Sequence, residues 1–141
     1  MPTRKASAGW EGGLKNGKGT FRGETGLAGA YSFSSRFEGG AGSNPEELLA
    51  AAEAACFSMA LALGLERADT PPARIDTDAA CTIDKLGDGF RIGKLRLSVR
   101  ARVPNVTDAK FQEIARATKE GCPVSVALRG VEIELEARLV Q

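Results

Sequence analysis

The alternation of apolar and polar positions is clearest near the end of the chain. Residues 131–139 place an apolar side chain at every second position and a charged one between. A period of two is that of a strand with one face buried and the other in water. Residues 75–86 and 90–103 show a similar pattern, and the Gly-Asp-Gly sequence at 87–89 predicts a hairpin between them. The charged face of the last strand comprises Glu132, Glu134, Glu136 and Arg138.

A long apolar segment at residues 45–67 predicts a helix. Asn44 can cap its N-terminus, Pro45 fits the first helical position, and Glu47 completes an Asn-x-x-Glu variant of the capping box. The Asp-Thr-Pro-Pro sequence at 69–72 ends the helix, whose length is about 34 Å at 1.5 Å per residue. Because a small sheet cannot cover a helix that is apolar on most sides, we expect a partner subunit, most simply in a symmetric homodimer.

A second helix is predicted from Asp108 to about Glu120. Thr107 is its N-cap, and Gly121 closes it as the residue after the C-cap. Cys122 then precedes a proline and a short apolar piece, which predicts a further helical segment with Cys122 at its N-cap.

The first forty residues indicate short strands with glycine-rich turns, including the stretch around Tyr31 to Phe37. The Asn16-Gly17 pair is a hairpin signal. The glycines at 39–42 lack the spacing of a phosphate-binding loop and favour a tight turn. Taken together, the order of elements predicts an α+β fold, in a single domain over residues 1–141.

Charge and hydropathy exclude several classes of protein. The chain of 141 residues has 19 Lys and Arg against 18 Asp and Glu, scattered along its length, so nucleic acid is a poor partner. The N-terminus lacks the apolar core of a signal peptide, which predicts a cytoplasmic protein. Residues 48–65 approach the length of a membrane span, but Glu53 and the many alanines argue against one.

The thiols are the strongest nucleophiles available. The chain has three cysteines and no histidine, so Cys-His hydrolases are excluded and a zinc site is not expected. An activated thiol must therefore depend on a cationic side chain, a helix end or a second cysteine.

The residues alone favour one of the three thiols. Cys81, in a predicted strand, and Cys56, inside the apolar helix, both fit a buried core. Cys122 follows a turn and begins a helix, a position that favours a thiolate and exposes it. By this argument Cys122 is the activated thiol.

Several short segments together resemble a known family. They are Ser-Arg-Phe-Glu-Gly-Gly at 35–40, Asn-Pro-Glu-Glu-Leu-Leu at 44–49, Ala-Ala-Cys-Phe-Ser-Met-Ala-Leu at 54–61 and Gly-Cys-Pro-Val-Ser at 121–125. In this combination, and over nearly the whole chain, the sequence resembles the OsmC branch of the OsmC/Ohr family of organic hydroperoxide reductases.

The resemblance implies a thiol peroxidase built as an intertwined homodimer, with antiparallel sheets packed around long central helices. It gives Cys56 the role of the peroxidatic cysteine, which becomes a sulfenic acid, and Cys122 that of the resolving cysteine, which closes a disulfide. Arg36 resembles the family's arginine and Glu46 the glutamate that holds it. The implied reductant is a dithiol, typically a lipoyl group on a protein, and no metal, flavin or haem is expected.

Physical chemistry is consistent with these roles. Burial and the nearby Glu53 should raise the pKa of Cys56, which a guanidinium would lower again. Phe37, Phe57 and Met59 are candidate walls for an alkyl group. Glu46 and Cys56 are ten residues apart on one helix, about 15 Å along its axis, so we expect Glu46 and Arg36 to serve a partner's Cys56.

Two other interpretations remain. A redox sensor or binding protein of the same fold would form the same disulfide with negligible turnover. A structural dimer would carry cysteines that do not react with peroxide.

Overall fold

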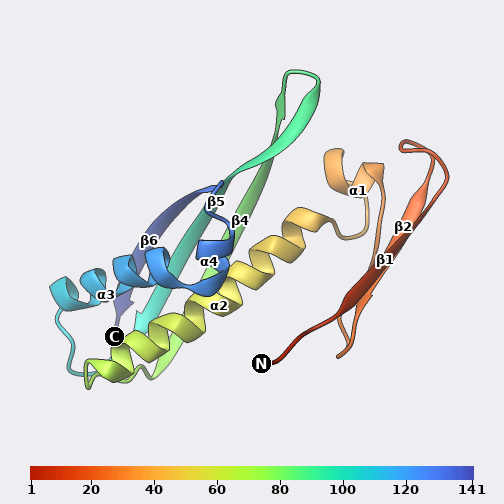
Figure 1. The fold of residues 1–141 in the computed structure, drawn as a ribbon. Coiled ribbons are helices and arrows are strands. Elements are labelled where there is room, and N and C mark those ends of the chain that lie inside the picture. The colour runs from red at the N-terminus through yellow and green to blue at the C-terminus, as the bar shows by residue number, and fades with distance from the viewer. The chain divides into compact units, whose positions relative to one another are not determined.

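The computed structural model describes residues 1–141 and divides the chain into two compact units, residues 1–47 and 48–141. Ten elements follow one another in the order β1, β2, β3, α1, α2, β4, β5, α3, α4, β6 (Figure 1). Strands and helices are interspersed around two separate sheets, which confirms the α+β class. That residues 1–141 form a single domain stays a prediction.

The first unit contains a three-stranded antiparallel sheet of β1 (Ala6–Glu11), β2 (Lys18–Gly23) and β3 (Ala28–Tyr31). The predicted hairpin joins β1 to β2, with Asn16 and Gly17 at the end of the connecting turn. All six residues of β1 are exposed to solvent, so this sheet has little core within its own unit.

Three aromatic side chains gather on one face of this sheet. The ring centroid of Tyr31 lies 5.4 Å from that of Trp10 and 6.0 Å from that of Phe21. Gly19 and Gly29 are paired opposite these residues, and a Cβ at either would lie within 2.6 Å of an aromatic ring atom. The two glycines therefore leave the space that the rings occupy.

The stretch around Tyr31 to Phe37 was expected to be a strand, and this prediction was wrong for most of it. Residues Phe33–Phe37 form the short helix α1. Ser32 accepts from the amide of Ser35 while the Ser35 hydroxyl accepts from the amide of Ser32, a reciprocal capping box. Those two hydroxyls satisfy the first amides of a helical turn, which the apolar pattern alone does not reveal.

Helix α2 spans Pro45–Arg67, the bounds that the sequence predicted. Asn44 caps it, because its Oδ1 accepts from the amide of Glu47 at 2.9 Å. The carboxylate of Glu47 accepts from the hydroxyl of Ser43, so the second half of the expected capping box runs to a neighbouring side chain. The predicted tight turn precedes the helix, with positive φ at Gly39 and Gly42.

The second unit is built on a sheet of β4 (Arg74–Leu86), β5 (Gly89–Arg102) and β6 (Glu132–Val140), in that order. β4 and β5 are antiparallel, but β6 pairs with β5 in parallel. The expectation of antiparallel sheets is therefore corrected for this strand, because the chain returns through two helices before β6 and enters it in the direction of β5.

The hairpin of β4 and β5 carries one irregularity. Thr82 pairs with Lys94 and Ile83 with Ile92, which leaves Gly93 as an extra residue in β5. A bulge shifts the alternation by one position, so Ile92 and Leu95 fit one apolar face despite their odd spacing. Figure 1 shows the tip of this hairpin projecting beyond the helices of the unit.

Helices cover one face of the second sheet. α3 (Asp108–Gly121) is capped by Thr107 as predicted, but Gly121 is its last helical residue and Cys122 its C-cap, one position from the expected end. The short α4 (Pro123–Ala127) follows, with Cys122 as its N-cap as predicted. The core joins α2, β5 and α3 through Phe57, Leu61, Leu65, Leu95, Leu97, Val99, Ala101, Val103, Phe111 and Ala115.

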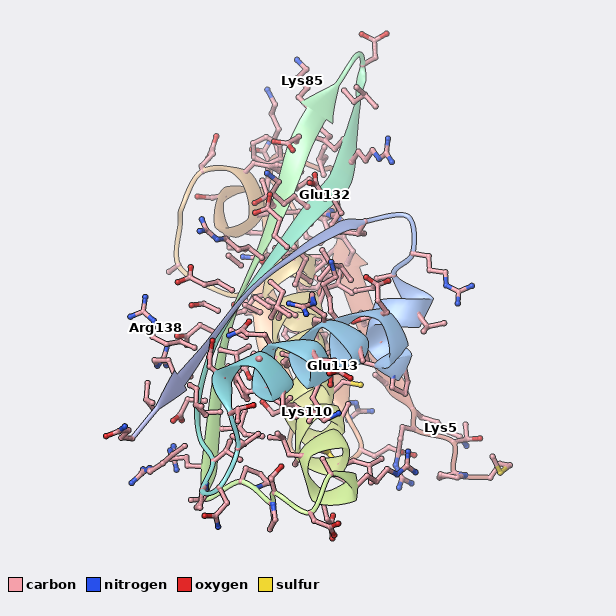
Figure 2. The ribbon with its side chains drawn as sticks, turned by 90° about the vertical axis from the view of Figure 1, so that its left-hand side faces the viewer. Lys5, Lys85, Lys110, Glu113, Glu132 and Arg138 are labelled. Carbon is pink, nitrogen blue, oxygen red and sulfur yellow. The ribbon has the colours of Figure 1, made fainter.

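The opposite face of β6 is charged. Figure 2 labels Glu132 and Arg138 near the two ends of this strand, away from the core. On α3, Lys110 and Glu113 form an exposed ion pair at 3.3 Å. The strict alternation of β6 thus corresponds to one packed and one exposed face, as the sequence predicted.

Candidate active site

Helix α2 presents two opposite faces within the second unit. Glu53, Phe57, Leu61 and Leu65 are spaced by four and are fully buried. On the other side, Ala51, Ala55, Met59 and Leu63 have the same spacing and are exposed. Cys56 lies between these faces and is half-buried. Its sulfur is therefore at the boundary between the core and the exposed side of the helix.

Cys122 lies at the junction of α3 and α4 and is buried, with 1% of its surface exposed. The sequence placed this thiol at a helix start and predicted that it would be exposed, which was wrong. The junction turns the side chain inward, onto α2, where its sulfur meets groups from residues 53 and 56. A position at a helix start determines the local backbone direction. It does not determine whether another element covers the side chain.

The two sulfurs are in contact. Cys122 Sγ donates to Cys56 Sγ at 2.8 Å, although 66 positions separate the two residues in the sequence. α2 supplies one thiol and the turn before Pro123 supplies the other. This proximity is the arrangement that the formation of a disulfide requires.

The surroundings of Cys56 raise the pKa of its thiol above the ordinary value. The largest cause is burial, followed by the hydrogen bond from Cys122; the negative charges of Cys122 and Glu53 act in the same direction. The backbone N–H of Val124 opposes the rise by donating to the sulfur. Burial and Glu53 are the two causes that the sequence predicted.

A buried carboxyl adjoins the two thiols. Glu53 is fully buried, and its Oε1 accepts from the hydroxyl of Ser125 at 2.5 Å and from Cys122 Sγ at 3.9 Å. From the sequence, Glu53 is only a charge within an apolar helix, and Ser125 is not among the predicted site residues. Their spacing could have indicated that both lie near the thiols. Glu53 precedes Cys56 by nearly one helical turn, and Ser125 follows Cys122 by the same interval.

The first unit brings together the predicted arginine and glutamate. Arg36 NH2 donates to Glu46 Oε1 at 2.7 Å, and Arg36 Nε lies 3.1 and 3.3 Å from the two carboxylate oxygens. The Glu46 side chain is 8% exposed and that of Arg36 33% exposed. The guanidinium also lies over the ring of Phe37, 5.4 Å from its centroid. The carboxylate thus holds the guanidinium in one orientation and leaves part of it accessible.

The remaining sequence candidates lie in different surroundings. Met59 is 76% exposed on α2, whereas Phe57 is fully buried in the core. Phe57 was predicted to line a substrate pocket, but a side chain enclosed by the core of its own unit offers no such surface. Cys81 packs against the core from β4, as expected for a strand residue.

The chain was compared with known families and proteins. The profile of the OsmC-like protein family matches residues 38–136. The chain is also 46% identical over 138 residues to the peroxiredoxin OsmC of Escherichia coli strain K12, covering 96% of each chain. The chain belongs to the OsmC-like family. The family predicted from the motifs is thereby confirmed.

Organic hydroperoxide resistance proteins are more distant relatives of this OsmC-like chain. It is 35% identical to OhrB of Bacillus subtilis strain 168 over 103 residues, which is 72% of this chain and 74% of the relative. Among solved structures, an organic hydroperoxide resistance protein from Elizabethkingia anophelis superimposes with a TM-score of 0.73 and 29% identity, over 99% of this chain and 98% of the other.

Proposed function

We propose that this OsmC-like chain is a cysteine-based peroxidase that reduces organic hydroperoxides to alcohols. The single observation that carries the proposal is the contact between the sulfurs of Cys56 and Cys122, 2.8 Å apart. The relatives named peroxiredoxin OsmC and organic hydroperoxide resistance protein support the same activity and the same class of substrate.

The reaction begins at Cys56. Its thiolate attacks the terminal oxygen of the hydroperoxide, the O–O bond breaks, and the alkoxide takes up a proton and leaves as an alcohol. Cys56 is then a sulfenic acid. Cys122 attacks the Cys56 sulfur, a disulfide forms and water leaves. A dithiol, for which we propose a lipoyl-type group, reduces the disulfide by exchange.

Arg36 is the proposed source of positive charge for this chemistry. The pKa of Cys56 is raised within its own unit, so the thiol needs a cation to become a thiolate at neutral pH. A guanidinium also donates to the peroxide oxygens as negative charge develops on the leaving one. Its orientation by Glu46 makes this donation directional.

The guanidinium that serves Cys56 comes from the other subunit in this proposal. Glu46 and Cys56 both lie on α2, ten residues apart, which is about 15 Å along the helix axis. An antiparallel α2 from a second copy would bring its start beside Cys56, and with it Arg36 of the partner subunit. Each dimer would then contain two sites, each built from both chains.

A homodimer is supported by two exposed apolar surfaces. One is the stripe of α2 that includes Met59, 76% exposed, and Leu63, 46% exposed. The other is the first sheet, where Trp10 is 38% exposed on an aromatic face. Burying exposed apolar surface is favourable, and a second copy of the chain would cover both surfaces.

The alkyl part of the substrate is proposed to contact Phe37 and Met59. Phe37 lies beside the Arg36 guanidinium, and Met59 lies one turn beyond Cys56 on α2. Apolar side chains near the two reacting groups favour an organic hydroperoxide over hydrogen peroxide, because an alkyl group gains from burial and a bare peroxide does not.

We further propose that the protein acts in the cytoplasm, where cysteine pairs are more often catalytic than structural. α2 is long and apolar enough to cross a membrane by length and composition. However, it carries Glu53 at its middle, and its buried stripe packs on the core of the second unit. These features favour the central helix of a folded domain over a membrane span.

The test is steady-state consumption of an alkyl hydroperoxide with a dithiol reductant in excess, using the full chain and Cys56→Ser. Turnover by the wild type that is lost in the variant supports the enzyme. A Cys56–Cys122 disulfide that forms after one equivalent of peroxide without turnover would instead support a redox sensor. Unchanged thiols would contradict both.

A further inference from the structure

One buried group next to the sulfurs has no role in the steps above. Glu53 is fully buried and takes no part in any of the chain's ion pairs. Its Oε1 accepts from Ser125 and Cys122, while its Oε2 is buried without a hydrogen-bond partner. Buried carboxyl groups are normally paired with a cation or satisfied by several donors.

The position of this carboxyl is specific. α4 brings Cys122 and Ser125 to the same side, three residues apart, and both donate to one oxygen of Glu53. Ser125 holds the carboxyl through the same oxygen that accepts from the thiol. The groups that surround the carboxyl and can change charge are the thiols of Cys122 and Cys56.

We propose that Glu53 accepts the proton of the Cys122 thiol when Cys122 attacks oxidised Cys56, and that Ser125 positions Glu53 for this transfer. The inference rests on the proposed function, because it assigns a role in its second step. It gives Glu53 a function that the peroxide reaction at Cys56 does not need.

The step balances in atoms and charge. The S–H bond of Cys122 breaks as its proton moves to the Glu53 carboxylate, and the thiolate attacks the sulfur of the Cys56 sulfenic acid. The S–S bond forms and the S–O bond breaks. The leaving hydroxide takes the proton back from the Glu53 carboxyl and becomes water, which returns Glu53 to the carboxylate. Cys56 sulfur is reduced as Cys122 sulfur is oxidised.

The same proton transfer is needed whenever Cys122 attacks the Cys56 sulfur, whichever leaving group it displaces. This allows a test that does not involve peroxide. In a Cys81→Ser background, Cys56 is converted to its mixed disulfide with thionitrobenzoate, and the release of the coloured thiol reports the attack by Cys122. The release rate is measured as a function of pH for the protein that keeps Glu53 and for its Glu53→Gln variant.

We expect Glu53→Gln to slow this release by about 100-fold to 10,000-fold at neutral pH, the range for loss of a general base. The deficit should shrink as pH rises, because hydroxide replaces the missing base. Alkylation of Cys56 should not slow, since the substitution removes a negative charge beside it. Glu53→Asp should keep a shallow pH profile like that of the wild type. The matched control, Glu113→Gln, removes an exposed carboxylate on α3 and should change nothing.

An equal release rate in the wild type and Glu53→Gln would overturn the proposal, and so would a deficit that does not depend on pH. Far-ultraviolet circular dichroism checks that each variant is folded. If Glu53→Gln does not fold, the Glu53→Asp variant serves instead. A release rate that rises with pH as steeply in this variant as for a free thiol would also overturn the proposal. If the wild type releases thionitrobenzoate as expected but consumes no hydroperoxide, the proposed function fails and this inference stands.

Discussion

Cys122 Sγ lies 2.8 Å from Cys56 Sγ before any oxidation has taken place. One sulfur comes from the middle of α2 and the other from the turn between α3 and α4. Sulfurs this close need only small side-chain rotations to reach the geometry of a disulfide. Oxidation and resolution can therefore proceed locally, without a large change in the fold.

Substitution of Cys56 and substitution of Cys122 should block different steps of the reaction. Cys56→Ser should abolish the reaction with an alkyl hydroperoxide, because the attacking sulfur is gone. Cys122→Ser should keep the first oxidation and accumulate a Cys56 sulfenic acid, since no partner thiol remains to displace it. Mass spectrometry after one equivalent of peroxide and a sulfenic acid trap distinguishes the two. Cys81→Ser is the control and should behave as wild type; loss of activity there would contradict the assignment.

Arg36→Lys should lower kcat/KM for the hydroperoxide by about 10-fold to 1,000-fold, although the charge is kept. Arg36 uses two nitrogens on Glu46, and an ammonium cannot reproduce that planar arrangement. Glu46→Gln should weaken the same orientation. Initial rates at several peroxide concentrations provide the measurement, and a lysine variant with wild-type kcat/KM would exclude a directional role.

Shared sites predict complementation between inactive variants. Mixing Cys56→Ser with Arg36→Ala should restore part of the activity, because one of the two sites in a mixed dimer would contain both wild-type residues. The measurement is peroxidase activity after subunit exchange, with each variant alone as the control. If exchange is verified and no activity returns, Arg36 and Cys56 of different subunits do not share a site.

The pH dependence of Cys56 reactivity should reveal whether Arg36 lowers the pKa of this thiol. Within its own unit the pKa of Cys56 is raised, chiefly by burial, and a nearby guanidinium lowers it. Arg36→Ala should therefore move the rise in Cys56 alkylation to higher pH. Alkylation rates of the two proteins in a Cys81→Ser, Cys122→Ser background measure the shift. Superimposable profiles would argue against any influence of Arg36.

The same pKa has a consequence for stability in the absence of the guanidinium. Because the folded-state pKa of Cys56 lies above the unfolded one, its contribution to stability is complete below the unfolded pKa. That contribution is lost as pH rises through the folded pKa. The free energy of unfolding of Arg36→Ala should thus decrease with alkaline pH more steeply than that of Arg36→Ala combined with Cys56→Ser.

Two neighbouring apolar residues on α2 should respond differently to truncation. Phe57→Ala leaves a cavity in the core and should cost about 3 to 5 kcal/mol. Met59→Ala removes an exposed side chain, so its effect should appear as weaker dimerisation. Urea unfolding at several protein concentrations separates the two effects. A Met59→Ala defect that is independent of concentration would count against a role at the interface.

Much of the fold followed from local patterns. The bounds of α2 were predictable because Asn44, Pro45 and the prolines after Thr70 act on the backbone within one turn. β6 was predictable because its alternation is strict. α1 was missed because its cap consists of two serine hydroxyls in a stretch without helical periodicity. The parallel pairing of β6 depends on the path of the chain through α3 and α4, which no local pattern encodes.

The amino-acid sequence by itself determined which side chains are available for chemistry: thiols without histidine, an arginine and a glutamate near a helix start, and the family to which their motifs belong. The tertiary structure decided which of them meet. Helix-end electrostatics favoured an exposed, reactive Cys122, but the packing of α4 buries this thiol against Cys56 and Glu53. Burial and contact depend on elements distant in sequence, and side-chain reactivity follows from those surroundings more than from position along the chain.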